Sequence, residues 1–241
     1  MTVKDHYDKH LGNFYSWMIG NFLEKQLEQE VFFSENNIKP SASKVAFDLG
    51  AGHGLQAVSL AKLGFSVKAV DFNDQLLKEL QTNKLGYDID VIKSDLLLFL
   101  KNEKGKAGAI VCMGDTLTHL ESISQVEQLV HNCSNLLIPK GKIIFSFRDL
   151  TTELKNVERF FAVKSDESRI LTCFLEYFQD YVLVHDILYE KENGTWKQKV
   201  SVYPKLRINE TQILKMLSEN RIQLINSRII NRMTYLIGEK Y

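Results

Sequence analysis

The sequence predicts an α/β fold whose central sheet is mainly parallel. Short apolar runs alternate with segments of helical periodicity between residues 45 and 147, and this alternation is typical of parallel strands joined by helices. A glycine-rich turn joins the first run, Val45–Leu49, to a helix that begins at Leu55. From Arg169 the rhythm changes to three strand-like runs with no helix between them, which predicts an added antiparallel unit.

The composition is that of an ordinary globular protein. Its 241 residues are 44% hydrophobic and 25% charged, and this length suits a single domain. Thirty basic and thirty acidic residues cancel, so the overall charge offers no footprint for nucleic acid or an anionic membrane. No apolar run is long enough to cross a bilayer, and the charged start lacks the apolar core of a secretory signal. We therefore expect a cytoplasmic protein with neither nucleic-acid nor membrane partners.

The turn after the first strand carries an acid, Asp48, and three glycines, Gly50, Gly52 and Gly54. Glycine at these positions permits positive φ and the close approach of a ligand. The helix start that follows adds unpaired N–H groups and the positive end of a dipole. A dinucleotide site would require glycine in place of Leu55, and Asp48 would repel a pyrophosphate. The pattern therefore favours a ligand that carries an amino group and a positive charge over a nicotinamide dinucleotide.

This stretch resembles motif I of the class I S-adenosylmethionine-dependent methyltransferases, which reads acid-x-Gly-x-Gly-x-Gly. The resemblance implies S-adenosylmethionine as cofactor, with Asp48 and the three glycines around its methionine portion. It also implies a Rossmann-like, seven-stranded sheet with an antiparallel last strand, in one domain over residues 1–241. The parts of that domain would be a helical cover (1–40), a cofactor-binding core (41–150), a β insertion that roofs the substrate (165–207), and a last helix with closing strands (208–241).

The region before the first strand predicts one or two helices. Apolar and aromatic residues recur there at helical spacing between residues 5 and 33. In the family this region often lies across the cofactor, and Tyr7, Tyr15 and Trp17 are the residues that could form such a cover. We assign Tyr15 to the cofactor by this resemblance. Packing of aromatic side chains onto the sheet is the alternative, which we favour for Phe14 and Trp17.

The second strand is predicted to end in an acid. The run Phe65–Val70 is apolar enough for a strand, Asp71 ends it, and Asn73 is suited to cap the next helix. An acid at this place can accept hydrogen bonds from both ribose hydroxyls of a nucleoside, as in dinucleotide folds. The resemblance assigns this role to Asp71 and lets Phe72 face the adenine.

The third strand, predicted over Ile89–Lys93, is followed by another acid. Asp95 opens a short helix, where the dipole favours a carboxylate. In similar methyltransferases an acid here accepts the adenine amino group, and the two roles are compatible. The resemblance therefore implies that Asp95, with Leu96 beside it, contacts the cofactor.

The fourth strand is predicted over Ala109–Met113, and the loop after it should face the reacting group. Ligands of open α/β sheets bind beyond the carboxyl ends of the strands. The loop lacks the Pro-Pro-aromatic sequence of amino-methylating DNA enzymes and is similar to that of glycine N-methyltransferase and its small-molecule relatives. The resemblance implies that Met113 contacts the cofactor and that Asp115 and His119 orient the substrate or help to remove its proton. A structural role is the alternative for His119.

The fifth strand brings an arginine to the same layer. A helix is predicted over Ile123–Leu137, a turn over Pro139–Gly141 and a strand over Lys142–Phe147, after which Arg148 follows. Arginine can hold a carboxylate in a bidentate fork. In glycine N-methyltransferase an arginine just after this strand does so for the amino acid substrate, and Arg148 occupies the matching place. A surface ion pair with a neighbouring acid is the alternative.

No metal site and no disulfide are predicted. Metal-dependent O-methyltransferases bring acids from these two loops and an Asn after the second, but Leu150 follows Asp149 here. The three cysteines are widely spaced and lie in apolar runs, so we expect buried thiols; they are Cys112, Cys133 and Cys173.

The three strand-like runs after Arg169 predict an antiparallel insertion above the substrate pocket; they are Ile170–Phe178, Tyr181–Tyr189 and Trp196–Tyr203. The Tyr-Pro pair that ends the last run also resembles glycine N-methyltransferase, which makes Tyr203 and Arg207 candidate pocket residues. Aromatic packing within the sheet is the alternative. A helix from Asn209 to Glu219 and two paired closing strands, Ile222–Ile230 and Met233–Gly238, complete the chain.

The function implied by the resemblance is methyl transfer to a small-molecule acceptor, with N-methylation of a carboxylate-bearing amine as the leading candidate. Alternatives are O-methylation of a small metabolite, a nicotinamide-dependent dehydrogenase and a non-catalytic nucleoside-binding protein of similar fold. The sequence leaves the methylated atom, the oligomeric state and the closure of the N-terminal helices over the cofactor open.

Overall fold

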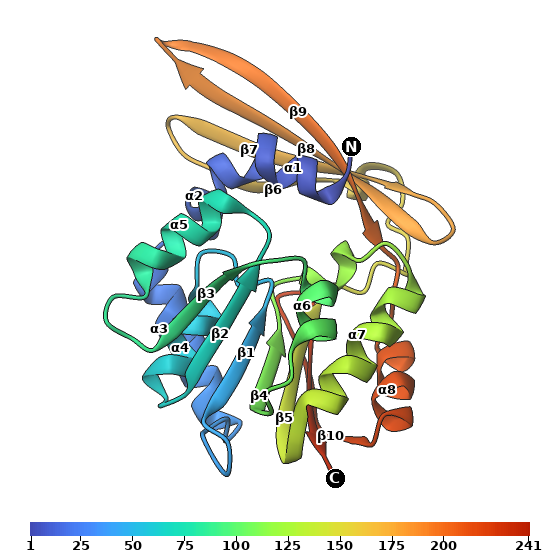
Figure 1. Ribbon diagram of the computed structural model, residues 1–241. Coiled ribbons are helices and arrows are strands. Elements are labelled where there is room, and N and C mark those ends of the chain that lie inside the picture. The colour runs from blue at the N-terminus through green and yellow to red at the C-terminus, as the bar shows by residue number, and fades with distance from the viewer.

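A seven-stranded sheet lies at the centre of the computed structural model, which describes residues 1–241 (Figure 1). Its strand order is β10-β11-β5-β4-β1-β2-β3, with parallel pairing from β5 to β3 and antiparallel pairing of β11 with both neighbours. The prediction of a Rossmann-like sheet with antiparallel closing strands is confirmed. The strands are β1 (Val45–Leu49), β2 (Ser66–Asp71), β3 (Ile89–Lys93), β4 (Ala107–Cys112), β5 (Leu137–Phe147), β10 (Ile222–Ile230) and β11 (Met233–Lys240).

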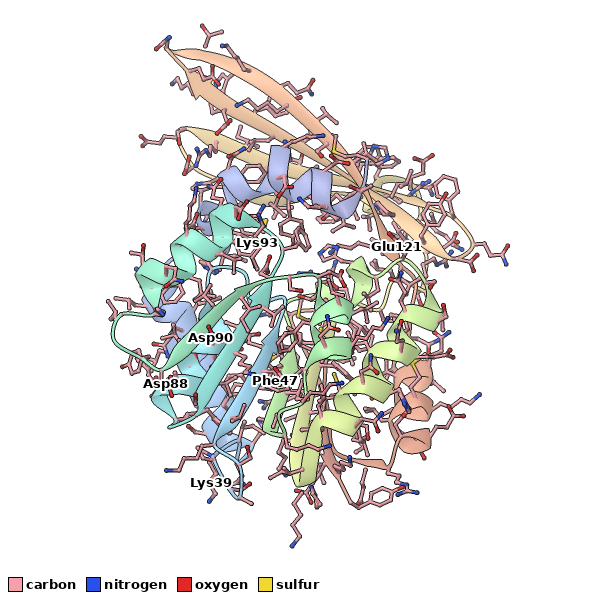
Figure 2. All side chains as sticks on the ribbon, viewed as in Figure 1. Lys39, Phe47, Asp88, Asp90, Lys93 and Glu121 are labelled. Carbon is pink, nitrogen blue, oxygen red and sulfur yellow. The ribbon has the colours of Figure 1, made fainter.

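Helices cover both faces of this sheet because its strands are apolar on both sides. Phe47 and Ile110 pack into one core cluster, whereas the neighbouring Ala46 and Val111 pack into the other. The first cluster is closed by α6 (Leu96–Asn102), α7 (Ile123–Leu136) and α8 (Glu210–Glu219). The second is closed by α3 (Phe22–Glu35), α4 (Leu55–Lys62) and α5 (Asp74–Asn83). Figure 2 shows Phe47 in the middle of the sheet, between the two helical layers.

Side-chain caps fix where two of these helices begin. Asn73 accepts a hydrogen bond from the Leu76 N–H at the start of α5, and Asn209 accepts one from the Gln212 N–H at the start of α8. Both helices begin where the sequence predicted. Because α5 follows β2 directly, its cap also fixes the loop that carries Asp71 and Phe72.

A second, antiparallel sheet lies across the carboxyl ends of the parallel strands (Figure 1). It consists of β6 (Phe160–Ser165), β7 (Arg169–Tyr177), β8 (Tyr181–Glu192) and β9 (Thr195–Leu206) in that order. The predicted antiparallel insertion is confirmed, and β6 adds an edge strand that was not predicted. Five of the six residues of β6 are exposed, so its sequence shows no alternation of buried and exposed positions.

The N-terminal segment runs between the two sheets. It forms α1 (Val3–Lys9), the 3₁₀ turn η1 (Leu11–Asn13) and α2 (Tyr15–Ile19) before α3. Helix α1 packs against β9, and Phe14 is buried with Leu171 and Leu188 of the second sheet, with Trp17 packed beside them. The preference for a packing role of Phe14 and Trp17 is therefore confirmed.

The connection into β5 differs from the prediction. A turn was expected over Pro139–Gly141, but β5 already begins at Leu137 and continues through this stretch. Lys140 has φ +61°, and the pairing with β4 shifts register between Ala107 and Ala109. The turn-forming residues therefore produce an irregularity within the strand rather than ending it.

Two further structural facts bear on the expectations from composition. All three cysteines are free and buried, as predicted. No helix combines the length and apolar character that spanning a membrane requires.

Glycine 238 offers a test of this core. A Cβ on Gly238 would overlap Cγ2 of Ile222 and lie 3.1 Å from Cγ2 of Ile143, so we expect Gly238→Ala to lower the free energy of unfolding by about 1–3 kcal/mol. A Cβ on Gly86 would meet nothing within 4 Å, so Gly86→Ala is the matched control and should change stability by less than about 0.5 kcal/mol. Urea unfolding followed by circular dichroism measures both; equal stability of the two variants would contradict the packing described here.

Candidate active site

The glycine turn after β1 is held by the backbone of β2. The N–H groups of Gly50 and Ala51 both donate to the carbonyl of Val70, at 2.9 and 3.0 Å. The N–H of Gly52 donates to Oδ2 of Asp71 at 2.8 Å. The turn and the acid at the end of β2 are therefore one hydrogen-bonded unit at the ligand-binding edge of the sheet.

The three glycines are needed for different reasons, although all have positive φ. A Cβ on Gly50 would overlap the side chain of Thr116, and a Cβ on Gly54 would lie 2.9 Å from Cγ of Leu80. Gly50 and Gly54 thus make room for protein side chains, not only for a ligand as the sequence suggested. At Gly52 the nearest atom would be the hydroxyl of Tyr15 at 3.7 Å, so only the backbone conformation, φ +52°, favours glycine there.

Asp48 is a buried carboxyl group that lacks a full set of partners. It is 1% exposed, and its Oδ2 has no hydrogen-bond partner. Burial, together with the nearby Asp71, raises the pKa of Asp48 to about 8. A buried acceptor without a donor is costly, so this position favours a ligand that brings a donor or a positive charge.

Asp71 lies beside the turn with both carboxylate oxygens partly used. Oδ2 accepts from Gly52, and Oδ1 accepts from the N–H of Asn73 at 2.9 Å. Burial raises the pKa of Asp71, and these two backbone donors act in the opposite direction. Each oxygen keeps a second lone pair for a ligand hydroxyl. Its role toward ribose stays a prediction.

The other predicted cofactor residues lie along the same edge with different exposure. Asp95 is exposed and caps α6 through a hydrogen bond from the Leu98 N–H at 2.9 Å, and Leu96 begins that helix half-buried. Phe72 is half-buried and Met113 is buried at the end of β4. The helix-start role of Asp95 is confirmed, whereas the contacts of these four residues with a cofactor stay predictions.

An aromatic cluster built around Tyr7 covers this edge. The ring of Tyr7 meets Phe72 at 5.6 Å, Tyr15 at 6.3 Å and His119 at 5.5 Å between centroids. The Tyr7 hydroxyl also lies 3.2 Å from Nε2 of His119. Helix α1 therefore brings one side chain into contact with the loops after β2 and β4 and with α2.

The same helix is fastened on its other side to the second sheet. His6, next to Tyr7, is fully buried; its ring stacks on Tyr203 at 3.8 Å and its Nδ1 lies 2.8 Å from the Ser201 hydroxyl. Burial lowers the pKa of His6 to about 2, so the imidazole is neutral. At the end of α1, Asp8 accepts a hydrogen bond from the Asn73 side chain at 2.8 Å. The cover is thus tied to both sheets.

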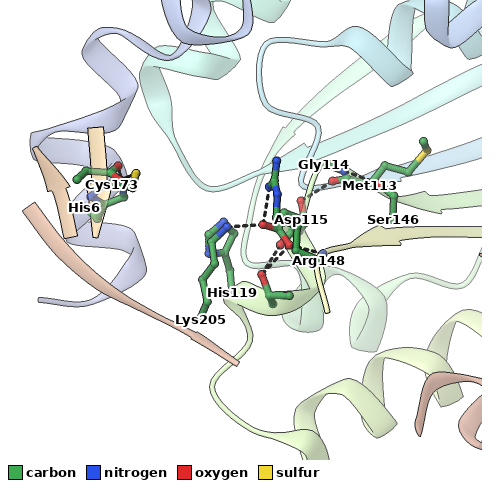
Figure 3. A network of polar contacts seen from close by, with 12 residues as sticks. His6, Met113, Gly114, Asp115, His119, Ser146, Arg148, Cys173 and Lys205 are labelled. Atoms are coloured by element: carbon green, nitrogen blue, oxygen red, sulfur yellow. Dashed lines mark hydrogen bonds and ion pairs between the residues drawn. The ribbon is translucent and has the colours of Figure 1, made fainter. Parts of the chain in front are cut away.

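Asp115 is the centre of a charged cluster in the loop after β4 (Figure 3). Its Oδ1 accepts from the Arg148 N–H and from the Thr118 hydroxyl, each at 3.0 Å. Its Oδ2 accepts from Nη1 of Arg148 at 3.0 Å and from Nζ of Lys205. Burial alone would raise the pKa of Asp115, but Lys205 and Arg148 outweigh it and hold the pKa below its usual range.

His119 and Tyr203 complete the layer where the acceptor was expected. His119 lies 5.8 Å from Tyr203 between centroids, and its Nδ1 is buried without a partner. Burial, reinforced by Lys205, lowers the pKa of His119 to about 3. A neutral imidazole beside a cation is suited to hydrogen bonding and poorly suited to taking up a proton.

The structure brings together residues that sequence reasoning did not connect. Lys205 was not predicted, although it stands two positions after Tyr203 on one strand and therefore on the same face. Arg207 was predicted for the pocket, but its guanidinium donates to Glu153 and to the carbonyls of Thr151 and Phe178. Arg207 accordingly fastens two loops together.

Arg148, the residue predicted to hold a substrate carboxylate, has a protein carboxylate as its partner. Arg148 pairs with Asp115, not with the neighbouring Asp149, and its side chain is 47% exposed. No group of three or more His, Cys, Asp or Glu side chains is arranged to hold a metal ion.

Comparison with known proteins agrees with this architecture. Residues 46–141 match the family model described as a methyltransferase domain. The ubiquinone biosynthesis O-methyltransferase of Xanthomonas axonopodis pv. citri (strain 306) is 29% identical over 111 residues, covering 45% of this chain and 44% of that protein. The glycine/sarcosine/dimethylglycine N-methyltransferase of Actinopolyspora halophila is 28% identical over 102 residues, covering 41% and 18%. The chain spans less than half the length of these curated relatives.

A solved structure extends the likeness to the whole fold. An S-adenosylmethionine-dependent methyltransferase from Clostridium acetobutylicum ATCC 824 superposes with a TM-score of 0.73 at 17% sequence identity, covering 97% of this chain and 96% of that one. That superposition extends far beyond the residues of the family match. Residues 46–141 therefore match a methyltransferase domain, and the chain has the fold of a solved S-adenosylmethionine-dependent methyltransferase over nearly its whole length.

Proposed function

We propose that the protein is an S-adenosylmethionine-dependent methyltransferase that methylates the amino group of a small, carboxylate-bearing acceptor. The observation that carries this proposal is a buried, incompletely paired Asp48 directly before the glycine turn. Such a group favours an ammonium or sulfonium and disfavours a diphosphate, which argues against the dehydrogenase alternative.

The residues present fit this cofactor. Asp48 and the turn glycines would hold its methionine portion, Asp71 would accept ribose hydroxyls with its remaining lone pairs, and Asp95 would meet the adenine. The bound cofactor supplies a methyl group on a positively charged sulfur, which is already activated for transfer. The protein's own contribution is to orient the acceptor and to exclude water.

The geometry around the acceptor supports an amine over a hydroxyl. Lys205 and Arg148 hold the pKa of Asp115 below its usual range, and the pKa of His119 is about 3, so neither group is suited to take a proton from the acceptor. An amine exchanges its proton with water, so the small fraction that is neutral at about pH 7.5 can attack the methyl group without a base in the site. An aliphatic hydroxyl keeps its proton at this pH. O-methylation is therefore the second candidate, and the similarity to a curated O-methyltransferase supports it.

Three binding and turnover measurements separate the candidate functions. Calorimetry with S-adenosylhomocysteine should detect binding to the folded protein, and fluorescence titration with NADH should not. Release of S-adenosylhomocysteine in a pooled screen of amines, acids and phenols should then identify the acceptor. Binding of NADH alone would favour the dehydrogenase, and cofactor binding without any turnover would favour the non-catalytic alternative.

The charge state of Asp48 gives a pH-dependence prediction. In the free protein the pKa of Asp48 is about 8, so the carboxyl must lose its proton before it can pair with the ligand's ammonium group. Affinity for S-adenosylhomocysteine should therefore rise with pH between 5.5 and 7.5, by at most about tenfold per pH unit, and level off above pH 8. Below pH 7.5 the ligand's own α-amino group stays largely protonated and does not mask this trend.

Calorimetry at five pH values tests this expectation, with Asp48→Asn as the control whose weaker binding should be independent of pH over the same range. Proton release is checked independently by repeating the wild-type titration in two buffers of different ionisation enthalpy. A wild-type affinity that stays constant from pH 5.5 to 7.5 would rule out a protonated Asp48 in the free protein.

A second prediction concerns His119. Because its imidazole is neutral and orients the acceptor, His119→Gln should lower kcat/KM for the identified acceptor by roughly 2- to 10-fold, the value of one hydrogen bond. The shape of the pH–rate profile should stay unchanged. A general base would instead show a loss of about 10²- to 10⁴-fold together with the disappearance of one ionisation. Steady-state kinetics from pH 6 to 9 distinguish the two outcomes.

A further inference from the structure

We infer that Lys205 of the second sheet binds the carboxylate of the methyl acceptor, and that Asp115 is a positioning residue for Lys205 and Arg148. This inference rests on the proposed methyltransferase function and assigns one group of the acceptor to one residue of the insertion. It starts from the charges in the cluster, which contains one carboxylate, Asp115, and two cations, Arg148 and Lys205.

Asp115 has little capacity left for a ligand, since three lone-pair positions of its carboxylate are taken and the Thr118 hydroxyl is shared between Oδ1 and the Asp115 carbonyl oxygen. A carboxylate offers about four lone-pair positions, and Asp115 accepts from the backbone and side chain of Arg148, from Thr118 and from Lys205. The side chain of Asp115 is only 3% exposed. Asp115 therefore holds the two cations in place and does not touch the acceptor.

The two cations, in contrast, have donors to spare. Lys205 has three N–H donors and one partner, although its side chain is only 11% exposed. Arg148 uses one side-chain nitrogen, Nη1, for Asp115 and leaves the rest of its fork free. Close by, Nδ1 of His119 is buried without a partner. Figure 3 shows Lys205 and Arg148 converging on Asp115, with His119 next to Lys205.

The charged groups around this cluster do not cancel its surplus. Asp186, the nearest carboxyl of the second sheet, accepts from the Cys173 thiol at 2.8 Å and lies 3.4 Å from Nε2 of His6. Burial raises the pKa of Asp186, and the Cys173 thiol and Lys205 act in the opposite direction. Asp48 and Asp71 belong to the glycine turn at the cofactor. Asp115, Arg148 and Lys205 together keep a formal surplus of one positive charge, and because Lys205 is only 11% exposed whereas Arg148 is 47% exposed, a ligand carboxylate would be needed mainly beside Lys205.

A monoanion balances this surplus, whereas a phosphate ester with nearly two negative charges would leave an unpaired negative charge. An ammonium donor beside a planar guanidinium is a common arrangement for a carboxylate. Lys205 shares the face of β9 with Tyr203, and its ammonium lies 6.0 Å from the Tyr203 ring. The second sheet therefore selects acceptors by their acid group, at a distance from the transferred methyl.

The test titrates sodium acetate, up to about 0.1 M, into protein saturated with S-adenosylhomocysteine. Sodium chloride keeps the ionic strength constant, and the melting temperature is recorded. Wild type should show a saturable rise, and Lys205→Met should weaken the acetate affinity by at least tenfold, as expected for loss of a charge-assisted hydrogen bond. Lys199→Met, an exposed lysine of the same strand that pairs with Glu190, is the matched control and should behave as wild type. Sodium phosphate should produce a smaller shift than acetate.

The outcomes are separable. Failure of all variants to bind S-adenosylhomocysteine would count against the proposed function, independently of Lys205. With that binding intact and equal within about twofold in the three proteins, the Lys205 inference is overturned by any of three results. These are no acetate response in wild type, an unchanged response in Lys205→Met, or a larger response to phosphate than to acetate. After an acceptor is identified, Lys205→Met should raise its KM while Lys205→Arg restores most of the affinity.

Discussion

The burial of two carboxyl groups where β1 and β2 end is the constraint on which the ligand-binding edge depends. Asp71 is compensated by the N–H groups of Gly52 and Asn73, but one oxygen of Asp48 is left without a donor. As pH rises from 3.8 toward 8, the folded state retains a proton on Asp48 that the unfolded chain releases, so this carboxyl makes the free fold progressively less stable. The burial of Asp48 thus destabilises the ligand-free fold, and a cation bound beside this carboxyl would offset that destabilisation.

The residues that we propose around the acceptor come from distant chain segments, including the second sheet and the N-terminal helix. Tyr7 comes from α1, Asp115 and His119 from the loop after β4, Arg148 from the end of β5 and Lys205 from β9. Helix α1 joins these parts because His6 packs on Tyr203 while the adjacent Tyr7 contacts Phe72 and His119. A change in the packing of the second sheet would therefore shift helix α1 and, with it, the side chain of Tyr7.

The central sheet could be predicted from the sequence because its strands have recognisable local sequence patterns. Runs such as Val45–Leu49 are apolar except for the acid near their end, and caps such as Asn73 mark the helix starts. The edge strand β6 also begins with four apolar residues, but they are exposed, and the turn residues around Lys140 produce an irregularity within a strand instead of ending it. Both differences arise because pairing with a neighbouring strand, which is absent from the local sequence, decides the conformation.

The position of the residues proposed for the cofactor could be predicted from the sequence, and the surroundings of the residues proposed for the acceptor less so. Asp48 lies near the end of β1 and Asp71 ends β2, so their place at the carboxyl edge of the sheet follows from topology alone. The state of Asp115 depends on Lys205, which is 90 positions away in sequence, and no local pattern shows that its carboxylate is largely occupied. The neutral state of His119 likewise results from burial and from the same lysine. Strand alternation from Tyr203 was the one signal that could have pointed to Lys205.

The reactivity of the three buried thiols depends on local unfolding of the regions that contain them. Cys112 lies on β4 and Cys133 on α7, both within the core of the central sheet, whereas Cys173 lies on β7 of the second sheet. Burial raises the pKa of each thiol, so in the closed molecule all three are shielded and weakly nucleophilic. Alkylation therefore proceeds through transiently exposed conformations. The alkylation rate of each thiol reports how often the region around it unfolds locally.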